Sequence, residues 1–222
     1  RQTQKTKTTT DGVPRLNCHA RLSGIDLYDS ENKPPDSKLA WLSTMQHYGV
    51  PTRLVDFTES PYVALYFAME DFQIDRGDDM VIFAIDYRSH LKASIDFIGS
   101  KDSGFKETTT TYSEKQDEIF DKVVDRFSYD VLWITEPTFL NKRLDRQAGS
   151  FLLPGNTEHK IEDVLNDGKY ANCKTHRLQI KSELHEQIFA LLRKMNLTSK
   201  TLFGDVMGLA KSIKMEMQVY ST

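Results

Sequence analysis

The sequence predicts an α/β (α+β) fold in which a central mixed sheet is flanked by helices, within one soluble domain. The clearest strand signal is the unbroken apolar run Met80–Ile85, which has strand length and is bounded by charged residues. The clearest helix signal is the regular recurrence of apolar residues between Lys38 and Tyr48. With 222 residues, of which 39% are apolar, the chain lies in the globular range. Surface scaling gives burial of roughly 70% of the unfolded surface, enough for one core.

The N-terminal part alternates between polar and apolar patterns. Residues 1–12 contain no apolar anchor and predict a flexible arm, which leaves residues 13–222 as the domain. Residues 29–36 combine charges with two prolines and predict a surface loop. A helix is expected from Lys38 to Tyr48, where Gly49 ends it. Its apolar face consists of Leu39, Leu42, Met45 and Tyr48.

Further strands and helices follow from the period of the apolar residues. Met80–Ile85 is expected to be a buried central strand, and 131–134 and 150–153 further strands, whereas 101–116 fits neither period and predicts a long exposed excursion. Leu178 and Ile180 alternate with polar residues as in an edge strand. Two helices close the prediction. The first is capped by Ser182 and carries Leu184, Ile188, Leu191, Leu192 and Met195. The second carries a stripe of Val206, Ala210, Ile213 and Met217.

Charge and patterning narrow the class of protein. The net charge of −3 provides no overall cationic field that would attract nucleic acid. The longest apolar run, Tyr62–Met69, is far shorter than the roughly 20 residues that a membrane helix needs. Cys18 and Cys173 are too few for a disulfide framework, and the chain opens without a leader pattern, so we expect a cytoplasmic protein with no membrane partner. The oligomeric state stays open.

Metal sites and familiar catalytic loops have little support. The only mixed cysteine and histidine pairs are Cys18-His19 and Cys173-x-x-His176, whose spacing is looser than in zinc fingers, so no metal is expected. The sequence contains no Gly-x-Ser-x-Gly elbow, no Walker motif and no Gly-x-Gly-x-x-Gly. Serine-hydrolase, P-loop and Rossmann classes are therefore disfavoured.

The segment Gln46–Ala68 gathers polar, aromatic and turn-forming residues between two apolar elements. Residues 49–51 predict a turn and 52–56 a short strand, and Ser60 is an N-cap residue followed by proline, which predicts the start of a helix. The first N–H groups of a helix are unpaired and lie at the positive end of its dipole. A phosphate-like anion would fit there, flanked by Thr58 and Ser60.

A purely structural interpretation of this segment is also open. In that interpretation Ser60 only caps the helix, Asp56 pairs with Arg53, and His47 bonds a buried backbone carbonyl. It explains each residue separately. It does not explain why a charged pair, an imidazole, two hydroxyls and a helix start lie within so short a segment. We therefore interpret the segment as a candidate ligand site.

The motif Gln46-His-Tyr-Gly-x-Pro-Thr-Arg-Leu-x-Asp-x-Thr-x-Ser-Pro61, which continues into Ala-Leu-Tyr-Phe-Ala, resembles the signature of the FRG domain family. Weaker likenesses lie at Arg143–Phe151, similar to the family's Arg-x-x-x-Gln-x-Gly-x-Phe region, and at Leu202–Leu209, similar to its C-terminal helix entry. The resemblance extends from about Leu39 to the end of the chain. The aromatic-Arg-Gly tripeptide that names the family is absent.

Family sequences are similar in outline to ADP-ribosyltransferase folds, in which an Arg motif, a hydroxyl-x-hydroxyl strand and a late Gln or Glu element follow in the same order. The resemblance thus implies a pocket at residues 46–61 and 143–151 for an NAD-like nucleotide, with NAD as substrate, in an effector or toxin of bacterial defence. The implied catalytic residues are His47, Arg53, Ser60 and Gln147. The implied ligand-binding residues are Tyr48, Thr52, Asp56, Thr58 and Arg143.

In this interpretation Arg53 or the helix start behind Ser60 holds the diphosphate, Tyr48 or Phe57 stacks on a ring, and Gln147 contacts the ribose. The element at Gln147 supplies no glutamate, and the nearest carboxylates are Glu136 and Asp145. Loss of one such electrostatic contact lowers a rate by about 10²- to 10³-fold, so binding without cleavage is open. The alternative function is a non-enzymatic module that binds a protein or nucleic-acid partner and uses the same polar segment as a structural latch.

Overall fold

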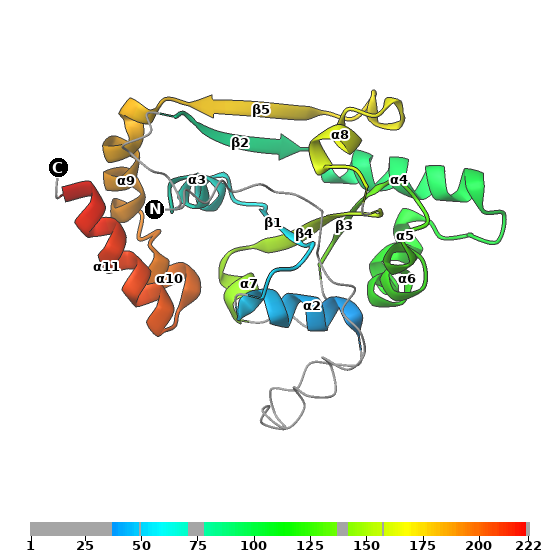
Figure 1. The fold of residues 1–222 in the computed structure, drawn as a ribbon, viewed down its shortest axis with the longest axis horizontal. Coiled ribbons are helices and arrows are strands. Elements are labelled where there is room, and N and C mark those ends of the chain that lie inside the picture. The colour runs from blue at the N-terminus through cyan, green and yellow to red at the C-terminus, as the bar shows by residue number, and fades with distance from the viewer. Residues whose placement is uncertain (1–36, 49, 71–77, 137–141, 157, 221–222) are drawn as a thin grey trace, which may run out of the picture. The chain divides into compact units, whose positions relative to one another are not determined.

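The computed structural model describes residues 37–48, 50–70, 78–136, 142–156 and 158–220 (Figure 1). They form helices and two small sheets, so the predicted α+β class is confirmed. The chain divides into two compact units. The predicted arm 1–12 and loop 29–36 lie outside the described residues.

The first unit draws on the ranges Arg1–Val55, His90–Phe139 and Leu152–Asn172. Its elements are α2 (Lys38–His47), α4 (Tyr87–Lys101) from His90 onward, α5 (Thr109–Glu114), α6 (Gln116–Lys122), the 3₁₀ turns η3 (Val124–Arg126) and η4 (Gly168–Tyr170), β3 (Leu132–Thr135) and α8 (Ile161–Leu165). All four residues of β3 are buried, which makes this strand the centre of the unit's core.

Helix α2 confirms the helix predicted from Lys38. The side chain of Ser37 caps it by accepting a hydrogen bond from Ala40 N at 3.2 Å. Leu39 and Ala40 are buried, and the helix ends at the cap residue Tyr48. The apolar spacing thus predicts the extent of the helix but not its buried face, which consists of Leu39, Ala40 and Ser43, whereas Tyr48 is 70% exposed.

The predicted excursion over 101–116 is mostly exposed, as expected, but it is not irregular throughout, since 109–114 form helix α5 and Tyr112 is buried. Thr108 and Thr111 form a capping box that starts α5, and the hydroxyl of the buried Tyr112 donates to Ile134 O at 2.5 Å. The β-branched polar residues that weaken a helix interior stabilise a helix start. The burial of Tyr112 against another part of the chain then stabilises a helix too short to persist alone.

The second unit draws on Asp56–Ser89, Leu140–Phe151 and Cys173–Thr222. Its elements are β1 (Val55–Thr58) from Asp56 onward, α3 (Pro61–Glu70), β2 (Met80–Ile85), the start of α4 up to Ser89, α7 (Lys142–Arg146), β5 (Thr175–Ile180), the 3₁₀ turn η5 (Ser182–Leu184), α9 (His185–Lys194), α10 (Ser199–Phe203) and α11 (Val206–Tyr220). Strand β4 (Gly149–Pro154) begins in this unit and ends in the first, in a three-stranded sheet of order β1-β4-β3.

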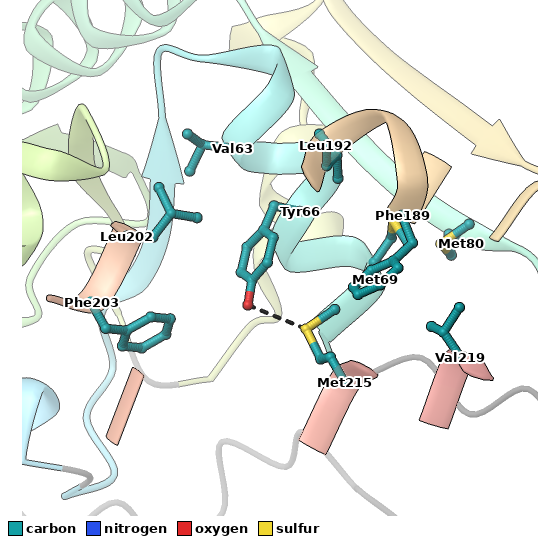
Figure 2. Packing of buried hydrophobic residues seen from close by; sticks show 10 residues of the cluster. All are labelled: Val63, Tyr66, Met69, Met80, Phe189, Leu192, Leu202, Phe203, Met215 and Val219. Carbon is teal, nitrogen blue, oxygen red and sulfur yellow. Dashed lines mark hydrogen bonds between the residues drawn. The ribbon is translucent and has the colours of Figure 1, made fainter. Parts of the chain in front are cut away.

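The core of the second unit is formed by α3, α9, α10 and α11 together with the first residue of β2 (Figure 2). Tyr66 of α3 lies at its centre, 2% exposed, with its hydroxyl bonded to Ser199 and 3.3 Å from the sulfur of Met215. Tyr66 therefore carries a polar group whose partners are supplied inside the core. The other members are Val63, Met69, Met80, Phe189, Leu192, Leu202, Phe203 and Val219.

Strand β2 was expected to be a buried central strand, and this was wrong. Among the described strands it pairs with β5 alone, antiparallel, in a two-stranded sheet in which Ile82 lies opposite Leu178. Phe83 is 39% exposed and Leu178 is 51% exposed. An unbroken apolar run predicts a strand that is buried on both faces. In β2 only Met80 is fully buried, because the described residues of this unit place no second sheet or helix over the rest of the strand.

The C-terminal helices lie where the apolar spacing predicts them, with two corrections. Ser182 begins the 3₁₀ turn η5 and makes no cap bond to α9, which starts at His185. On α11 the predicted stripe of Val206, Ala210, Ile213 and Met217 is exposed, and the buried side carries Gly208, Met215 and Val219. At Gly208 a β-carbon would lie 2.6 Å from Ser199 O, so α10 and α11 approach closely there.

Candidate functional site

The nine residues predicted to form the site divide between the two units. The first unit holds His47, Tyr48, Thr52 and Arg53. The second unit holds Asp56, Thr58, Ser60, Arg143 and Gln147. Each group has its own geometry.

Arg53 is the most constrained residue of the first group. Its side chain is 11% exposed, its Nη2 donates to Asp125 Oδ1 at 2.7 Å, and its guanidinium lies 4.2 Å from the ring centroid of Phe127. Burial lowers the pKa of Arg53, and Asp125 opposes that effect. Lys38 Nζ contacts the other oxygen of Asp125 at 2.7 Å. Arg53 therefore belongs to a buried ion cluster that also receives aromatic packing.

One nitrogen of Arg53 remains available. Nη1 is buried and has no hydrogen-bond partner among the residues that the structure describes. A buried donor of this kind ordinarily has a hydrogen-bond partner. Nη1 is the feature of the first group most compatible with a ligand.

The other three residues of the first group lie at the end of α2 and after it. The rings of His47 and Tyr48 meet edge to face at 4.9 Å, and Tyr48 is 70% exposed. Thr52 Oγ1 donates to the side chain of Gln46 and accepts from Leu54 N at 3.2 Å. This local turn explains why the strand predicted at 52–56 begins only at Val55.

In the second group, Thr58, Ser60 and Gln147 are joined directly. Thr58 Oγ1 donates to Gln147 O at 2.7 Å and accepts from Ser60 N at 3.0 Å. Gln147 is 4% exposed, and its Nε2 donates to Leu202 O at 3.3 Å. The structure thus brings the motif around Thr58 and the segment around Gln147 together, as predicted from two distant parts of the sequence. The side-chain amide of Gln147 holds α10 in this arrangement.

The helix start predicted at Ser60 is present. Helix α3 begins at Pro61, and Ser60 Oγ accepts from Val63 N at 3.4 Å, close to the upper limit for a hydrogen bond. Pro61 has no N–H to offer. The amide end of α3 is therefore capped weakly by its own serine, and Tyr62 in its first turn is 47% exposed.

Basic side chains gather around Phe203, next to Gln147. The guanidinium of Arg143 lies 4.1 Å and Nζ of Lys211 4.4 Å from the centroid of the Phe203 ring. Arg146 Nη1 donates to Phe203 O at 3.3 Å. Lys211 also pairs with Glu70 at 3.1 Å, whereas no ion pair of Arg143 occurs within the described part of the chain. Arg143 is thus one of the cations that have no carboxylate partner among the described residues.

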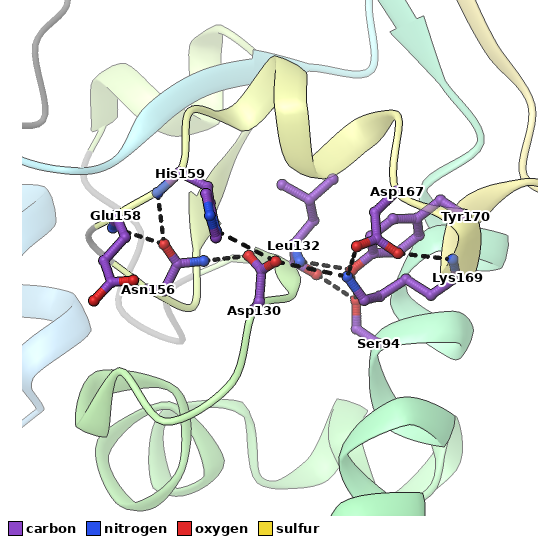
Figure 3. Close-up of polar contacts among 9 residues, drawn as sticks. All are labelled: Ser94, Asp130, Leu132, Asn156, Glu158, His159, Asp167, Lys169 and Tyr170. Atoms are coloured by element: carbon purple, nitrogen blue, oxygen red, sulfur yellow. Dashed lines mark hydrogen bonds and ion pairs between the residues drawn. The ribbon is translucent and has the colours of Figure 1, made fainter.

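Sequence reasoning missed a polar network in the first unit (Figure 3). Asp130 accepts from the side chain of Asn156 and lies 3.4 Å from His159 Nδ1. Lys169, whose side chain is 10% exposed, pairs with Asp167 at 2.8 Å. The charges of this network are matched locally, so it is a structural element of the unit. The signal that could have indicated it was a set of four charged or amide residues on either side of a short helix, α8.

A second part of that network is buried. The hydroxyl of Tyr170 accepts from Leu132 N at 2.7 Å and bonds Ser94 Oγ at 2.8 Å, and Ser94 donates to Leu132 O at 2.6 Å. Burial raises the pKa of Tyr170 to about 12. His90, which is fully buried, stacks on the Tyr170 ring at 5.4 Å. These bonds satisfy the backbone of β3 at its start.

An open cavity of about 740 Å³ lies beside β2 and β5 and is lined by none of the nine predicted residues. Asp79 accepts there from Lys181 Nζ at 2.8 Å, Gln179 Nε2 at 2.6 Å and Ser182 N at 3.2 Å. The bonds from Lys181 and Gln179, the two largest causes, lower the pKa of Asp79 to about 2. The polar groups that line the cavity are thus largely paired with one another.

The described residues define an α+β protein in which a strand with a hydroxyl-x-hydroxyl end leads into a capped helix. Comparison with known families identifies this stretch. Residues 16–76 match the FRG domain, a segment that includes α2, β1 and α3 with the whole motif from Gln46 to Pro61. The chain therefore carries FRG domain sequence, and the family predicted from the motif is confirmed over this segment.

The match leaves the later part of the chain unassigned. The weaker likenesses at 143–151 and 202–209 lie outside it. No curated protein and no solved structure matches the chain. Within the described ranges, every helix is too short or too polar to cross a bilayer.

Proposed function

We propose that the chain is an FRG-type domain that binds an NAD-like nucleotide in its second unit. The observation that carries this proposal is the bond of Thr58 to Gln147, which joins the turn 58–60 at the start of α3 to the segment that holds Arg143. Phosphate oxygens favour both a helix N-terminus and a guanidinium without a carboxylate partner.

The proposed contacts involve a weakly bonded N–H group, a cation without a carboxylate partner among the described residues, and an exposed aromatic ring. A phosphate oxygen replaces Ser60 Oγ as acceptor for Val63 N, since the existing bond is 3.4 Å long. Arg143 supplies positive charge and keeps its guanidinium planar against Phe203. The exposed ring of Tyr62, in the first turn of α3, is available to stack on a base or nicotinamide.

As an enzyme, this site would transfer ADP-ribose or hydrolyse NAD. That chemistry requires a carboxylate near the ribose to stabilise a cation-like transition state. In this unit the exposed carboxylates closest in sequence to the turn and to Arg143 are Asp56, Glu59 and Asp145. Glu59 lies between the two hydroxyl residues, and its N–H donates to Ala148 O at 3.0 Å, beside Gln147. Glu59 is the carboxylate that we assign to this role.

One observation favours the second candidate function, a module that binds a protein or nucleic-acid partner. Arg53 and Thr58, two central residues of the motif, bond to Asp125 and Gln147 of the protein itself. A motif engaged in this way acts as a latch that positions surrounding surfaces. In this reading the domain has no NAD chemistry.

The experiment is incubation of the protein with NAD or ADP-ribose, followed by melting temperature and by nicotinamide release. The proposal predicts that ADP-ribose raises the melting temperature and that Arg143→Ala abolishes this shift. Arg126→Ala is the matched control, because Arg126 is an exposed arginine of the first unit and belongs to none of the proposed nucleotide contacts.

The outcomes separate the candidates. Nicotinamide release that Glu59→Gln removes, with the ADP-ribose shift retained, supports the enzyme. A shift without release supports nucleotide binding alone. An unchanged melting temperature with both ligands contradicts the nucleotide proposal and leaves the binding module.

A further inference from the structure

Helix α11 is apolar on two opposite sides. One side packs into the core of the second unit through Gly208, Met215 and Val219. The other side, which we call the α11 stripe, consists of Val206, Leu209, Ala210, Ile213 and Met217, all of them exposed. Val206 is 81% and Met217 63% exposed. A helix that only covers its own core would carry polar residues at these positions.

The stripe has the geometry of a helix-pairing seam. With 100° between successive residues, its members fall on the side opposite Met215. From Val206 through Ala210 and Ile213 to Met217 the steps alternate between four and three residues, the spacing at which two helices interdigitate. The sequence prediction therefore identified a real stripe, although the described residues of the protein leave it uncovered.

The exposed area is large enough for a specific contact. Together with the neighbouring Met207, which is 66% exposed, the stripe exposes roughly 500 Å² of mainly apolar surface, toward the upper end for the largest patch of a monomer. Two such surfaces pressed together bury about 1,000 Å² in total, the size at which specific interfaces begin. A smaller partner segment would leave part of the stripe in water.

Charge favours a second copy as the occupant. No residue of the stripe is charged, so two copies meet without repulsion at the centre of the contact. Lys211 pairs with Glu70 at 3.1 Å and Glu216 with Arg193 at 3.4 Å, which leaves Lys214 as the charged residue of α11 not engaged in an ion pair within the described residues. A nucleic acid or an acidic membrane surface would require more positive charge beside the stripe.

We propose that α11 is a homodimerisation helix, whose stripe packs against the same stripe of a second copy about a twofold axis. This goes beyond nucleotide binding and is independent of it, because no stripe residue belongs to the proposed nucleotide site.

Sedimentation velocity of the full chain over a range of micromolar concentrations tests the proposal. The wild-type protein is expected to dimerise, and Ile213→Glu is expected to weaken the dimer at least tenfold, because a carboxylate would be buried at the seam. Gln218→Glu is the matched control, since it places the same charge on an exposed position of the same helix away from the stripe. A wild-type chain that remains monomeric, or a dimer unaffected by Ile213→Glu, overturns the proposal.

Cross-linking provides a second measurement that does not depend on the charged variant folding. Ile213→Cys, in a chain with Cys18 and Cys173 changed to serine, is expected to yield a covalent dimer on mild oxidation. Gln218→Cys in the same background is expected to yield much less. Equal cross-linking at the two positions would count against a seam at the stripe. A monomer that instead binds lipid vesicles would identify a membrane surface as the occupant and refute the homodimer.

Discussion

Arg53 and Asp125, 72 positions apart in sequence, form a 2.7 Å ion pair that lies mostly out of water. The guanidinium is also enclosed by the rings of Phe120 and Phe127. The most conspicuous cation of the FRG motif thus connects the segment after α2 to the turn after α6. Its first role is to hold the first unit together.

Replacing Arg53 by alanine should destabilise the protein. Removing one partner of a buried pair leaves the other charge poorly solvated, which typically costs about 3–5 kcal/mol. Because Lys38 still contacts Asp125, we expect the lower end of this range, about 3 kcal/mol. Urea unfolding of the wild-type and variant proteins measures this loss of unfolding free energy. Arg126→Ala, an exposed arginine nearby, should change stability by less than about 0.5 kcal/mol. Similar effects of both substitutions would refute the latch role of Arg53.

Gly204 should tolerate no side chain. Its φ is +71°, and a β-carbon would lie 1.0 Å from Arg146 Nη1, which is bonded to Phe203 O. Gly204→Ala is expected to cost about 1–2 kcal/mol for the left-handed backbone, and more for displacing Arg146. Thermal denaturation tests this, with Gly168→Ala as control because a β-carbon there meets open space. Adding Arg146→Ala should recover only the steric part of the loss.

The hydroxyl of Tyr170 should contribute more to the free energy of unfolding than an exposed tyrosine hydroxyl does. Tyr170→Phe removes the acceptor of the buried Leu132 N and a partner of Ser94, which should cost about 1–3 kcal/mol. Tyr129→Phe, which removes an exposed hydroxyl 3.3 Å from Asp102, is the control and should be near neutral. Equal losses in urea unfolding would contradict the special role of Tyr170.

The pKa of Tyr170 also has a consequence at high pH. Its folded pKa of about 12 exceeds the unfolded value of about 10. The unfolded chain therefore loses this proton first as the pH rises, and stability should fall between about pH 10 and pH 12. Tyr170→Phe should reduce the slope of this part of the stability curve, and the remaining slope comes in part from the buried Tyr112, whose pKa burial also raises. Tyr129→Phe should change the slope less.

Asp79 should make the second unit sensitive to acid. Its carboxylate is held by Lys181, Gln179 and Ser182 N, and its pKa is lowered to about 2 from an unfolded value of about 3.9. The contribution to stability is present above the unfolded pKa and is lost as the pH falls from about 4 toward 2. NMR titration of the carboxyl measures the pKa. In acid unfolding, Asp79→Asn should flatten the profile in this window, and an unchanged profile would contradict the assignment.

Local signals in the sequence determined several elements correctly. The apolar spacing after Lys38 predicts α2, and Ser60 followed by proline predicts the start of α3, because periodicity and caps act within a few residues. The motif from Gln46 to Pro61 also suffices to identify FRG domain sequence. The prediction that the motif and the segment at Gln147 lie together came from the family resemblance and not from the physical properties of the residues.

Tertiary structure alone decided how these residues are used. Asp125, not a neighbour in the motif, balances Arg53, and Thr58 bonds to the backbone of Gln147. Burial also depends on the tertiary structure. The sequence of β2 predicts a central strand, but β2 belongs to a two-stranded sheet. The most regular apolar stripe of α11 is exposed. Periodicity shows that one face of an element is apolar. Whether that face is buried depends on contacts with residues far away in the chain, and these contacts cannot be predicted from the local sequence.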